Sequence, residues 1–404
     1  MAGSPQVAAA ETIIAASPQD QTLDAFYVAR GNRPLWLTGS GNQAQILLNY
    51  LQTADADGLI PNLARLRDLD QAMRQLSHSN KTTISKTDRL LSQAYVDYVR
   101  EVRRLKSSEM IWVDPELRPS AVFPRRLLDE AAAAPSLEAY LAEMHWMNPI
   151  YAGLRRAIVS GGDGHRDLLA RNLDRARALP SGGGRDVIVN AAAAQLTMVE
   201  GRKPVDSMRV VVGKPIYPTP MMAALIRFTS LNPYWNVPPD LAAERIAPEV
   251  VKEGKAYLKL KGYQLLSSWD DDAAVVNPAT VNWAAVAAGK QEVRIRQLPG
   301  PSNAMGKMKF MFPNALGIYL HDTPDKQLLS EASRMFSGGC VRLADAPRLA
   351  RWLYQGKPPS TASAKPEQRV DLPEPVPVFL TYLTAVPGET GIDYFPDVYN
   401  RDRN

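Results

Sequence analysis

Cysteine is almost absent from this sequence, which has one cysteine, Cys340, and only four histidines in 404 residues. A single cysteine excludes an intramolecular disulfide framework and any zinc or iron–sulfur site built from several thiolates. Three of the histidines, His78, His145 and His165, are scattered without the spacing of metal ligands. We therefore expect neither a metal site nor a cofactor.

Long apolar runs and strong charge are also lacking. No stretch approaches the ~18 consecutive apolar residues of a membrane span, and residues 1–20 lack the basic start and apolar core of a signal peptide. The net charge is only +5, and no basic stripe interleaved with aromatics is present, so we expect no nucleic-acid partner. With 45% apolar and 22% charged residues, the composition is that of an ordinary globular protein of two or three domains.

Two patterns divide the chain near residue 180. Apolar residues recur at three and four positions through residues 24–179, which predicts helices. After the glycine run Gly182–Gly184 the pattern turns strand-like, with short β-branched segments. We therefore predict an α+β protein with a flexible segment at 1–23, a helical domain at 24–180 and a mainly β domain at 185–404, in which 238–290 form an inserted helical lid.

The lone cysteine lies in the segment Phe336-Ser-Gly-Gly-Cys-Val-Arg342, followed by a predicted helix at 345–354. Glycines let the backbone turn and present its amides, and amides that enter a helix lower a thiol pKa and bind an oxyanion. His321 ends a predicted strand 19 residues earlier (340 − 321). A Cys–His pair within hydrogen-bond reach forms a thiolate nucleophile, although a lone buried cysteine is more often structural.

These segments resemble the YkuD-type catalytic domain of L,D-transpeptidases, whose signature is a histidine followed within twenty residues by Ser/Thr-X-Gly-Cys-Val/Ile-Arg/Asn. Ser337–Arg342 fits this signature. The resemblance extends to the larger, lid-bearing branch of the family, through the segments Val212-Gly-Lys-Pro215, Asn232-Pro-Tyr-Trp-Asn-Val-Pro-Pro239, Pro299-Gly-Pro-Ser-Asn303, Lys309-Phe310, Tyr319-Leu-His-Asp-Thr-Pro324 and Thr381-Tyr-Leu-Thr384. The helical half is similar to the scaffold domain of that branch.

The resemblance implies a role for each of nine residues. Cys340 is the expected nucleophile and His321 the expected general base. The remaining candidates are Gly338, Gly339, Ser337 and Arg342 for the oxyanion hole and its loop, and Tyr319, Trp235 and Asn303 for the substrate groove. Several alternatives stay open: a helix cap for Ser337, a loop-bracing ion pair for Arg342, and core packing for Tyr319 and Trp235.

The family's chemistry implies a peptidoglycan enzyme that forms 3→3 cross-links through a thioester with a tetrapeptide stem, releases D-alanine and is acylated by carbapenems. One alternative uses the same acyl-enzyme for hydrolysis or D-amino acid exchange. Another is a cell-wall adaptor of weak activity whose helical half recruits another cell-wall protein. The chain departs from the family in having Gly338 where many members have histidine and in lacking the branch's usual peptidoglycan-binding module. We expect a periplasmic protein whose signal peptide has been removed.

Overall fold

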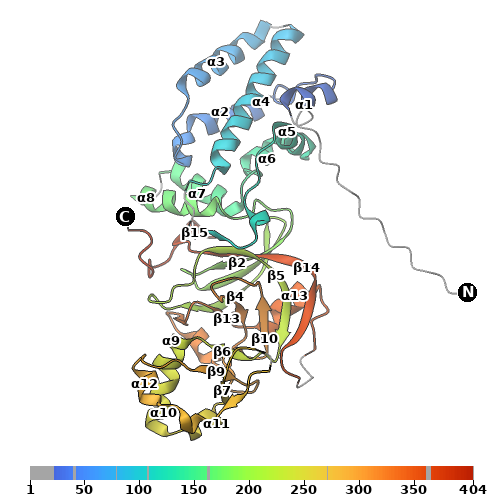
Figure 1. The fold of residues 1–404 in the computed structure, drawn as a ribbon. Helices are drawn as coiled ribbons and strands as arrows, with labels where there is room; N and C mark the ends of the chain where they lie inside the picture. The colour runs from blue at the N-terminus through green and yellow to red at the C-terminus, as the bar shows by residue number, and fades with distance from the viewer. Residues whose placement is uncertain are drawn as a thin grey trace, which may run out of the picture. The chain divides into compact units, whose positions relative to one another are not determined.

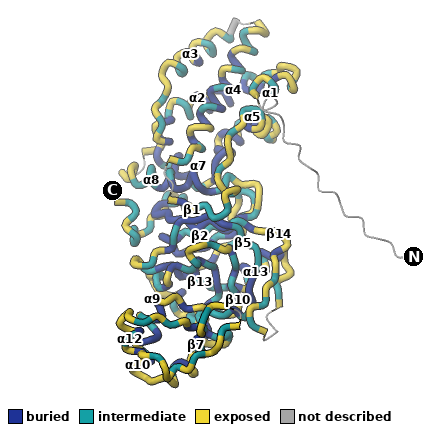
Figure 2. Tube along the Cα trace, in the orientation of Figure 1, coloured by how far each residue is buried: buried dark blue, intermediate teal, exposed yellow. Residues whose placement is uncertain are grey.

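The computed structural model describes residues 22–39, 42–78, 80–106, 109–161, 164–270, 272–360 and 365–403. Almost all of the predicted flexible segment at 1–23 lies outside these ranges. The chain forms two compact units, one comprising Met1–Arg104 and Ser120–Ser160 and the other comprising Leu105–Pro119 and Gly161–Asn404. The buried residues, dark blue in Figure 2, run through the helices of the first unit and the strands of the second.

The first unit is helical, as the apolar periodicity predicts. Its elements are α1 (Leu23–Ala29), α2 (Asn42–Gln52), η2 (Ala54–Asp57), α3 (Leu63–Arg74), η3 (Gln75–His78), α4 (Lys81–Arg103), α5 (Pro124–Ala133), α6 (Leu137–Ala142) and α7 (Pro149–Val159). Asn148 caps α7 by accepting a hydrogen bond from the amide of Tyr151, and Pro149 takes the first helical position, where its missing amide costs nothing.

The unit boundary differs from the expected one at residue 180, because α8 (Arg166–Ala176) belongs to the second unit. The side chain of Asn172 on α8 donates to Thr384 Oγ1 at 3.0 Å and accepts from the Thr384 amide at 2.8 Å. Both residues are buried, so this pair fixes α8 to the chain just beyond the long C-terminal strand. The segment 105–119 also joins this unit, since β1 (Ile111–Trp112) pairs with β5 (Met222–Leu231).

A closed sheet forms the centre of the second unit (Figure 1). Besides β1, the described part of the sheet contains β2 (Arg185–Asn190), β3 (Gln195–Glu200), β4 (Lys203–Gly213), β5 (Met222–Leu231), β10 (Met308–Met311), β11 (Leu320–His321), β12 (Met335–Ser337), β13 (Val341–Leu343) and β14 (Gln368–Thr381). The strand order is β1-β5-β10-β11-β13-β4-β3-β2-β14, and β14 also pairs with β5, which closes the ring. Helix α13 (Ala346–Leu353) follows β13, and η4 (Pro115–Leu117), η8 (Lys326–Ser330), β15 (Ala385–Pro387) and β16 (Ile392–Tyr394) complete this body.

The predicted lid is a separate lobe with its own core, but it is not purely helical. It contains β6 (Trp235–Val237), α9 (Pro239–Leu241), the π-helical turn η6 (Ala242–Ile246), α10 (Ala247–Glu253), α11 (Ala256–Leu260), β7 (Tyr263–Leu266), β8 (Val275–Val276), η7 (Pro278–Thr280), α12 (Trp283–Ala287) and β9 (Arg294–Gln297). Four of these elements form a sheet in the order β6-β9-β7-β8, and Ile295, Val237 and Leu265 bury their side chains in the core of the lobe. Figure 1 shows the lobe beside β10 and β13.

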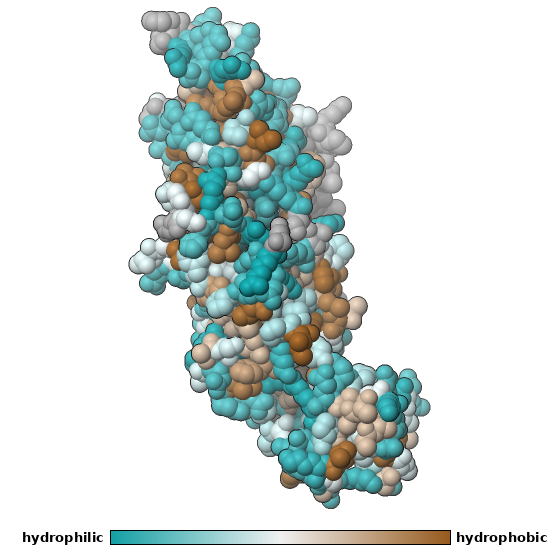
Figure 3. Space-filling view, turned by 90° about the vertical axis from the view of Figure 1, so that its left-hand side faces the viewer, coloured by the Kyte–Doolittle hydropathy of each residue, from teal (hydrophilic) through white to brown (hydrophobic). Residues whose placement is uncertain are grey.

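Hydrophilic residues dominate the face drawn in Figure 3, and the apolar ones form small separate groups between them. Among the described residues, no helix combines the length and the apolar character that a membrane crossing requires.

Candidate active site

Cys340 lies in the tight connection between β12 and β13, at the centre of the closed sheet. The helix predicted at 345–354 is present as α13, but the expectation that the amides of the cysteine segment enter this helix is wrong. Val341–Leu343 form strand β13, which pairs with β11 and β4, and α13 begins only at Ala346, where Asp345 caps it through the amide of Arg348. A helix terminus therefore does not act on the thiol, and its reactivity must come from neighbouring side chains and loop amides.

Two glycines and a threonine shape the connection that carries the cysteine. Gly339 has φ +111°, a conformation that L side chains rarely adopt, and a Cβ there would meet Ile318 Cδ1 at 3.1 Å. Thr219 Oγ1 donates to the Gly339 carbonyl at 2.8 Å and accepts from the Gly213 amide at 2.9 Å. A Cβ on Gly213, the last residue of β4, would lie 2.1 Å from the carbonyl oxygen of Tyr217. Only glycine therefore fits at this position.

Ser337 braces the same connection from within. Its hydroxyl donates to the Cys340 carbonyl at 2.5 Å and accepts from the Gly339 amide at 3.1 Å. It is therefore not a helix cap, one of the two alternatives open from the sequence. The amide of Gly339, an expected oxyanion donor, is committed to Ser337, whereas those of Gly338 and Cys340 have no hydrogen-bond partner among the described residues.

His321 is buried, with 1% of its surface exposed, at the end of β11. Its Nδ1 lies 2.6 Å from the carbonyl oxygen of Asp322, so Nδ1 carries the proton and donates it. Burial, together with the positive charge of Arg342, lowers the pKa of His321 from 6.5 to about 3. The ring is therefore neutral near pH 7, and Nε2 is left with a free lone pair, as a general base requires.

The thiol of Cys340 donates to the Gly317 carbonyl at 3.4 Å. Burial raises its pKa, while a backbone hydrogen bond from Tyr319 and the charges of Lys309 and Arg342 lower it. β11 and β13 run parallel, with His321 opposite Arg342 and Leu320 opposite Val341. Cys340 thus immediately precedes β13, the strand next to the one that carries His321.

Sequence reasoning gave no role to Lys309, which lies opposite His321 on the neighbouring strand β10. Its Nζ is 3.8 Å from the centroid of the Tyr319 ring, and burial lowers its pKa. The sequence did contain a signal, because Lys309 is the one charged residue in the apolar strand Met308-Lys-Phe-Met311. Arg342, the other cation of the site, forms an ion pair with Asp325 at 3.1 Å, which agrees with the loop-bracing alternative.

The three expected groove residues occupy different environments. Tyr319 is half-buried beside the nucleophile, and the negative charge of the thiolate contributes with burial to raising its pKa. Trp235 packs against the core of the inserted lobe. Asn303 is completely buried, donates to the carbonyls of Pro233 and Leu298 at 3.0 Å and accepts from the Met305 amide at 2.7 Å. The geometry of Asn303 therefore supports a loop-bracing role and not a substrate contact.

The inserted lobe reaches the cysteine connection through Leu241 of α9. A Cβ on Gly338 would lie 3.3 Å from Leu241 Cδ1, so an apolar side chain of the lobe lies beside this exposed glycine. Glu244, three residues further on, accepts a hydrogen bond from the hydroxyl of Tyr217 at 2.7 Å. The predicted capping position of the insert is consistent with these contacts.

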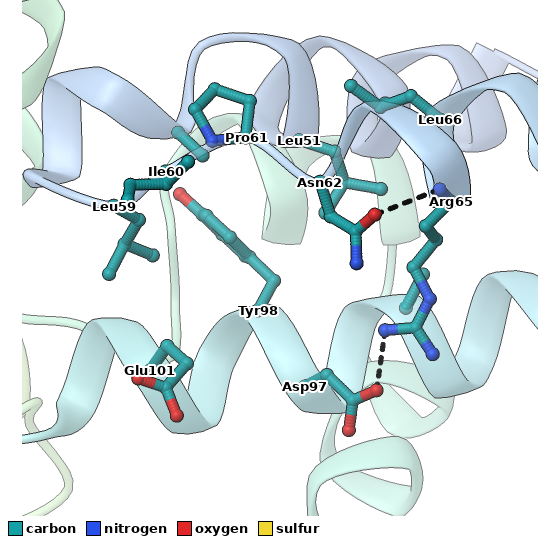
Figure 4. A pocket seen from close by; sticks show the side chains of 12 residues that line it. Leu51, Leu59, Ile60, Pro61, Asn62, Arg65, Leu66, Asp97, Tyr98 and Glu101 are labelled. Atoms are coloured by element: carbon teal, nitrogen blue, oxygen red, sulfur yellow. Dashed lines mark hydrogen bonds and ion pairs between the residues drawn. The ribbon is translucent and has the colours of Figure 1, made fainter.

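The helical unit has a separate pocket of about 300 Å³, shown in Figure 4. Leu59, Ile60 and Pro61 line it from one side and Tyr98 of α4 from the other, and the ion pair between Arg65 and Asp97, at 2.6 Å, lies at one end. No group of three or more His, Cys, Asp or Glu within the described ranges could hold a metal ion.

The closed sheet thus brings together a half-buried thiol, a neutral histidine oriented by a carbonyl and loop amides without a partner among the described residues, and such a set of groups can support acyl transfer by a cysteine. Residues 184–368 match the L,D-transpeptidase catalytic domain (YkuD), and residues 21–158 match the Scaffold domain. The chain belongs to the L,D-transpeptidases that carry an N-terminal Scaffold domain, and the α+β class predicted from the sequence is confirmed.

Two known proteins illustrate the similarity. A Haemophilus influenzae protein named "Putative L,D-transpeptidase" is 26% identical over 396 residues, which span 94% of this chain and 78% of that protein. A solved L,D-transpeptidase from Mycobacterium smegmatis is 15% identical, with a TM-score of 0.24 over 49% of this chain and 59% of that one.

Proposed function

We propose that this L,D-transpeptidase cross-links peptidoglycan outside the cytoplasm, in the periplasm, by a two-step acyl transfer through Cys340. The observation that carries the proposal is the environment of His321, whose Nδ1 is held by the Asp322 carbonyl while Nε2 has no hydrogen-bond partner among the described residues. A neutral imidazole on the strand next to the nucleophile is suited to take the thiol proton.

In the first step the Cys340 sulfur attacks the carbonyl carbon of the third residue of a tetrapeptide stem, and His321 accepts the thiol proton. The amides of Cys340 and Gly338 stabilise the oxyanion, a contribution of roughly 10²–10³-fold per donor. The peptide bond to the fourth residue breaks, His321 protonates the departing D-alanine amine, and a thioester remains. In the second step the side-chain amine of another stem's third residue attacks the thioester, which regenerates the thiol and completes a 3→3 link.

The contact between Leu241 and Gly338 favours transfer over hydrolysis. An apolar side chain beside the connection offers water no hydrogen-bond partner, whereas a peptide acceptor gains binding energy by packing against it.

Intact-protein mass spectrometry tests the proposal. A defined tetrapeptide is expected to add the mass of its first three residues to the protein, and an added amine acceptor should remove that adduct as a cross-linked product. A carbapenem should add its full mass to the same cysteine. Retained peptide adduct in Cys340→Ala contradicts the assigned nucleophile, and an adduct that decays equally fast without acceptor favours the hydrolytic alternative.

A further inference from the structure

We infer that Lys309 binds the terminal carboxylate of the donor tetrapeptide, and so selects donors that end at the residue to be expelled. This inference rests on the proposed function. It concerns the substrate that this site accepts and the residue that recognises it.

Lys309 is a half-buried cation with no salt bridge. Within the part of the chain that the structure describes, its Nζ has neither a hydrogen bond nor an ion pair, and it lies over the Tyr319 ring, 3.8 Å from the ring centroid. The nearby carboxylate of Glu367 acts on it only at longer range, because that carboxylate accepts hydrogen bonds from Ser230 Oγ at 3.0 Å and the Tyr234 amide at 2.5 Å. Removing an ammonium from water costs free energy unless an anionic ligand pairs with it.

The strand register directs this cation to the nucleophile. Lys309 lies opposite His321, and its charge acts on both His321 and Cys340. Packing on Tyr319, whose backbone also bonds the thiol, holds the ammonium beside the reacting sulfur.

The other cations near the site are less suited to this role. Arg342 already forms its ion pair with Asp325 at 3.1 Å. Arg245, on the π-helical turn of the inserted lobe, acts on Arg342, but unlike Lys309 its charge has no resolved effect on the pKa of Cys340. Lys309 is therefore the cation best placed for an anionic group next to the scissile bond.

The chemistry of the donor identifies that anionic group. In a tetrapeptide, only the amide nitrogen and one Cα separate the scissile carbonyl from the terminal carboxyl carbon, so the two carbons lie within about 4 Å of each other. The other carboxylates of a stem peptide are several bonds further away. In a longer stem the corresponding carboxyl group is an uncharged amide, which leaves the half-buried ammonium without a counter-ion. Enzymes discriminate strongly against a substrate that leaves such a polar group unpaired.

The test compares kcat/KM for acylation by a tetrapeptide and by the same peptide with its C-terminus amidated. The wild type should prefer the acid by roughly 100-fold, and Lys309→Met should bring this ratio close to parity by losing rate on the acid alone. Lys309→Arg, which keeps the charge, should retain most of the preference. Lys307→Met, an exposed lysine on the same segment, is the matched control and should leave the ratio unchanged.

Because the ratio compares two substrates on one enzyme, any effect of Lys309 on thiol reactivity cancels. Alkylation of Cys340 by iodoacetamide and the urea unfolding midpoint show that each variant is folded, and Lys309→Gln provides a second variant if Lys309→Met is not. A wild type that acylates equally well with acid and amide, or an unchanged ratio in both variants, overturns the inference alone. A wild type acylated by neither peptide, while iodoacetamide still labels Cys340, refutes the proposed function and this inference with it.

Discussion

The polar groups buried in the helical unit and those around Cys340 in the catalytic unit differ in how far they are hydrogen-bonded. In the helical unit, Asp88 is completely buried and accepts hydrogen bonds from the amides of Leu35, Trp36 and Leu37 and from the hydroxyl of Tyr27, all at 2.6–3.0 Å. In the catalytic unit, the Lys309 ammonium has no hydrogen bond among the described residues, and the thiol of Cys340 has a long one to the Gly317 carbonyl and one from the Tyr319 backbone.

A second carboxylate of the helical unit repeats the pattern. Asp57 is completely buried and accepts hydrogen bonds from Tyr98 at 2.8 Å, Tyr151 at 2.7 Å and the Arg155 guanidinium at 2.9 Å. Saturated buried charges of this kind stabilise one arrangement of helices, because every alternative arrangement leaves a charge unpaired. The unsaturated groups around Cys340 cost stability and keep their hydrogen-bonding capacity for a substrate.

The contrast between saturated and unsaturated buried groups is tested most strongly at the nucleophile. Cys340→Ala is expected to reduce acylation by roughly 10⁶-fold, since no other group in the site replaces the attacking sulfur. The free energy of unfolding should change by less than about 1 kcal/mol, because the hydrogen bonds of a thiol are weak. Mass spectrometry measures the adduct and urea denaturation the stability. A large loss of stability would show that the cysteine is structural.

Removing one partner from the saturated network should have the opposite effect. Asp57→Ala leaves the Arg155 guanidinium buried without its counter-ion, and we expect the helical unit to lose about 3–5 kcal/mol. Calorimetry of the full chain should show the transition of this unit at lower temperature.

The matched control is Asp70→Ala, which breaks an Asp–Arg pair with Arg74 of similar length, 2.8 Å, on the exposed surface of α3. It should cost less than about 0.5 kcal/mol. Equal effects of the two substitutions would remove the distinction between saturated burial and surface pairing.

The lowered pKa of His321 leads us to expect a specific dependence of stability on pH. Its folded pKa of about 3 lies below the unfolded value of 6.5, so between these values the unfolded chain binds a proton that the folded chain refuses. Stability should therefore fall as the pH drops from about 6.5 toward 3, with a slope of up to about 1.4 kcal/mol per pH unit. Urea unfolding measured over this range in the wild type and in His321→Gln isolates the contribution, because every other group titrates in both proteins. Parallel curves would mean that the ring titrates normally.

Sequence periodicity predicted the helical unit well, since in helices such as α4 apolar residues recur at three and four positions and form one face over many turns. The sheet of the inserted lobe was not predictable, because β6, β7, β8 and β9 have only two to four residues each and lie between helical patterns. The nucleophile segment also misled the prediction. The helix predicted at 345–354 is present as α13, but Val341–Leu343 are too few to show an alternating pattern, so strand β13 between the cysteine and this helix was not predicted.

The candidate site was predictable where a residue's chemistry is carried by its type and its immediate neighbours, as for Cys340 and His321. It was not predictable where the partner comes from a distant segment. Asn303 was expected in the groove, but its partners, including the Pro233 carbonyl 70 residues away, make it a buried brace. Lys309 is conspicuous in the sequence as the one charged residue of an apolar strand, but its place opposite His321 required the register of β10 against β11, which no local pattern shows.

The smallest expected effect asks whether unsaturated burial is confined to the active site. Asp186 on β2 is buried, and its carboxylate has no hydrogen bond among the described residues. Burial raises the pKa of this carboxylate from 3.8 to about 6. Its folded state therefore binds a proton more tightly than the unfolded state, and stability is lost as the pH rises from about 4 through 6. Asp186→Asn, which cannot ionise, should stabilise the catalytic unit at about pH 7 by roughly 1–2 kcal/mol and have no effect below about pH 4.

The exposed strand carboxylate Asp371 provides the control, and Asp371→Asn should change stability by less than about 0.5 kcal/mol at either pH. If Asp186→Asn instead destabilises the protein near neutral pH, this carboxylate has a partner that stabilises its charge, and the cost of unpaired burial in this unit is restricted to the residues around Cys340.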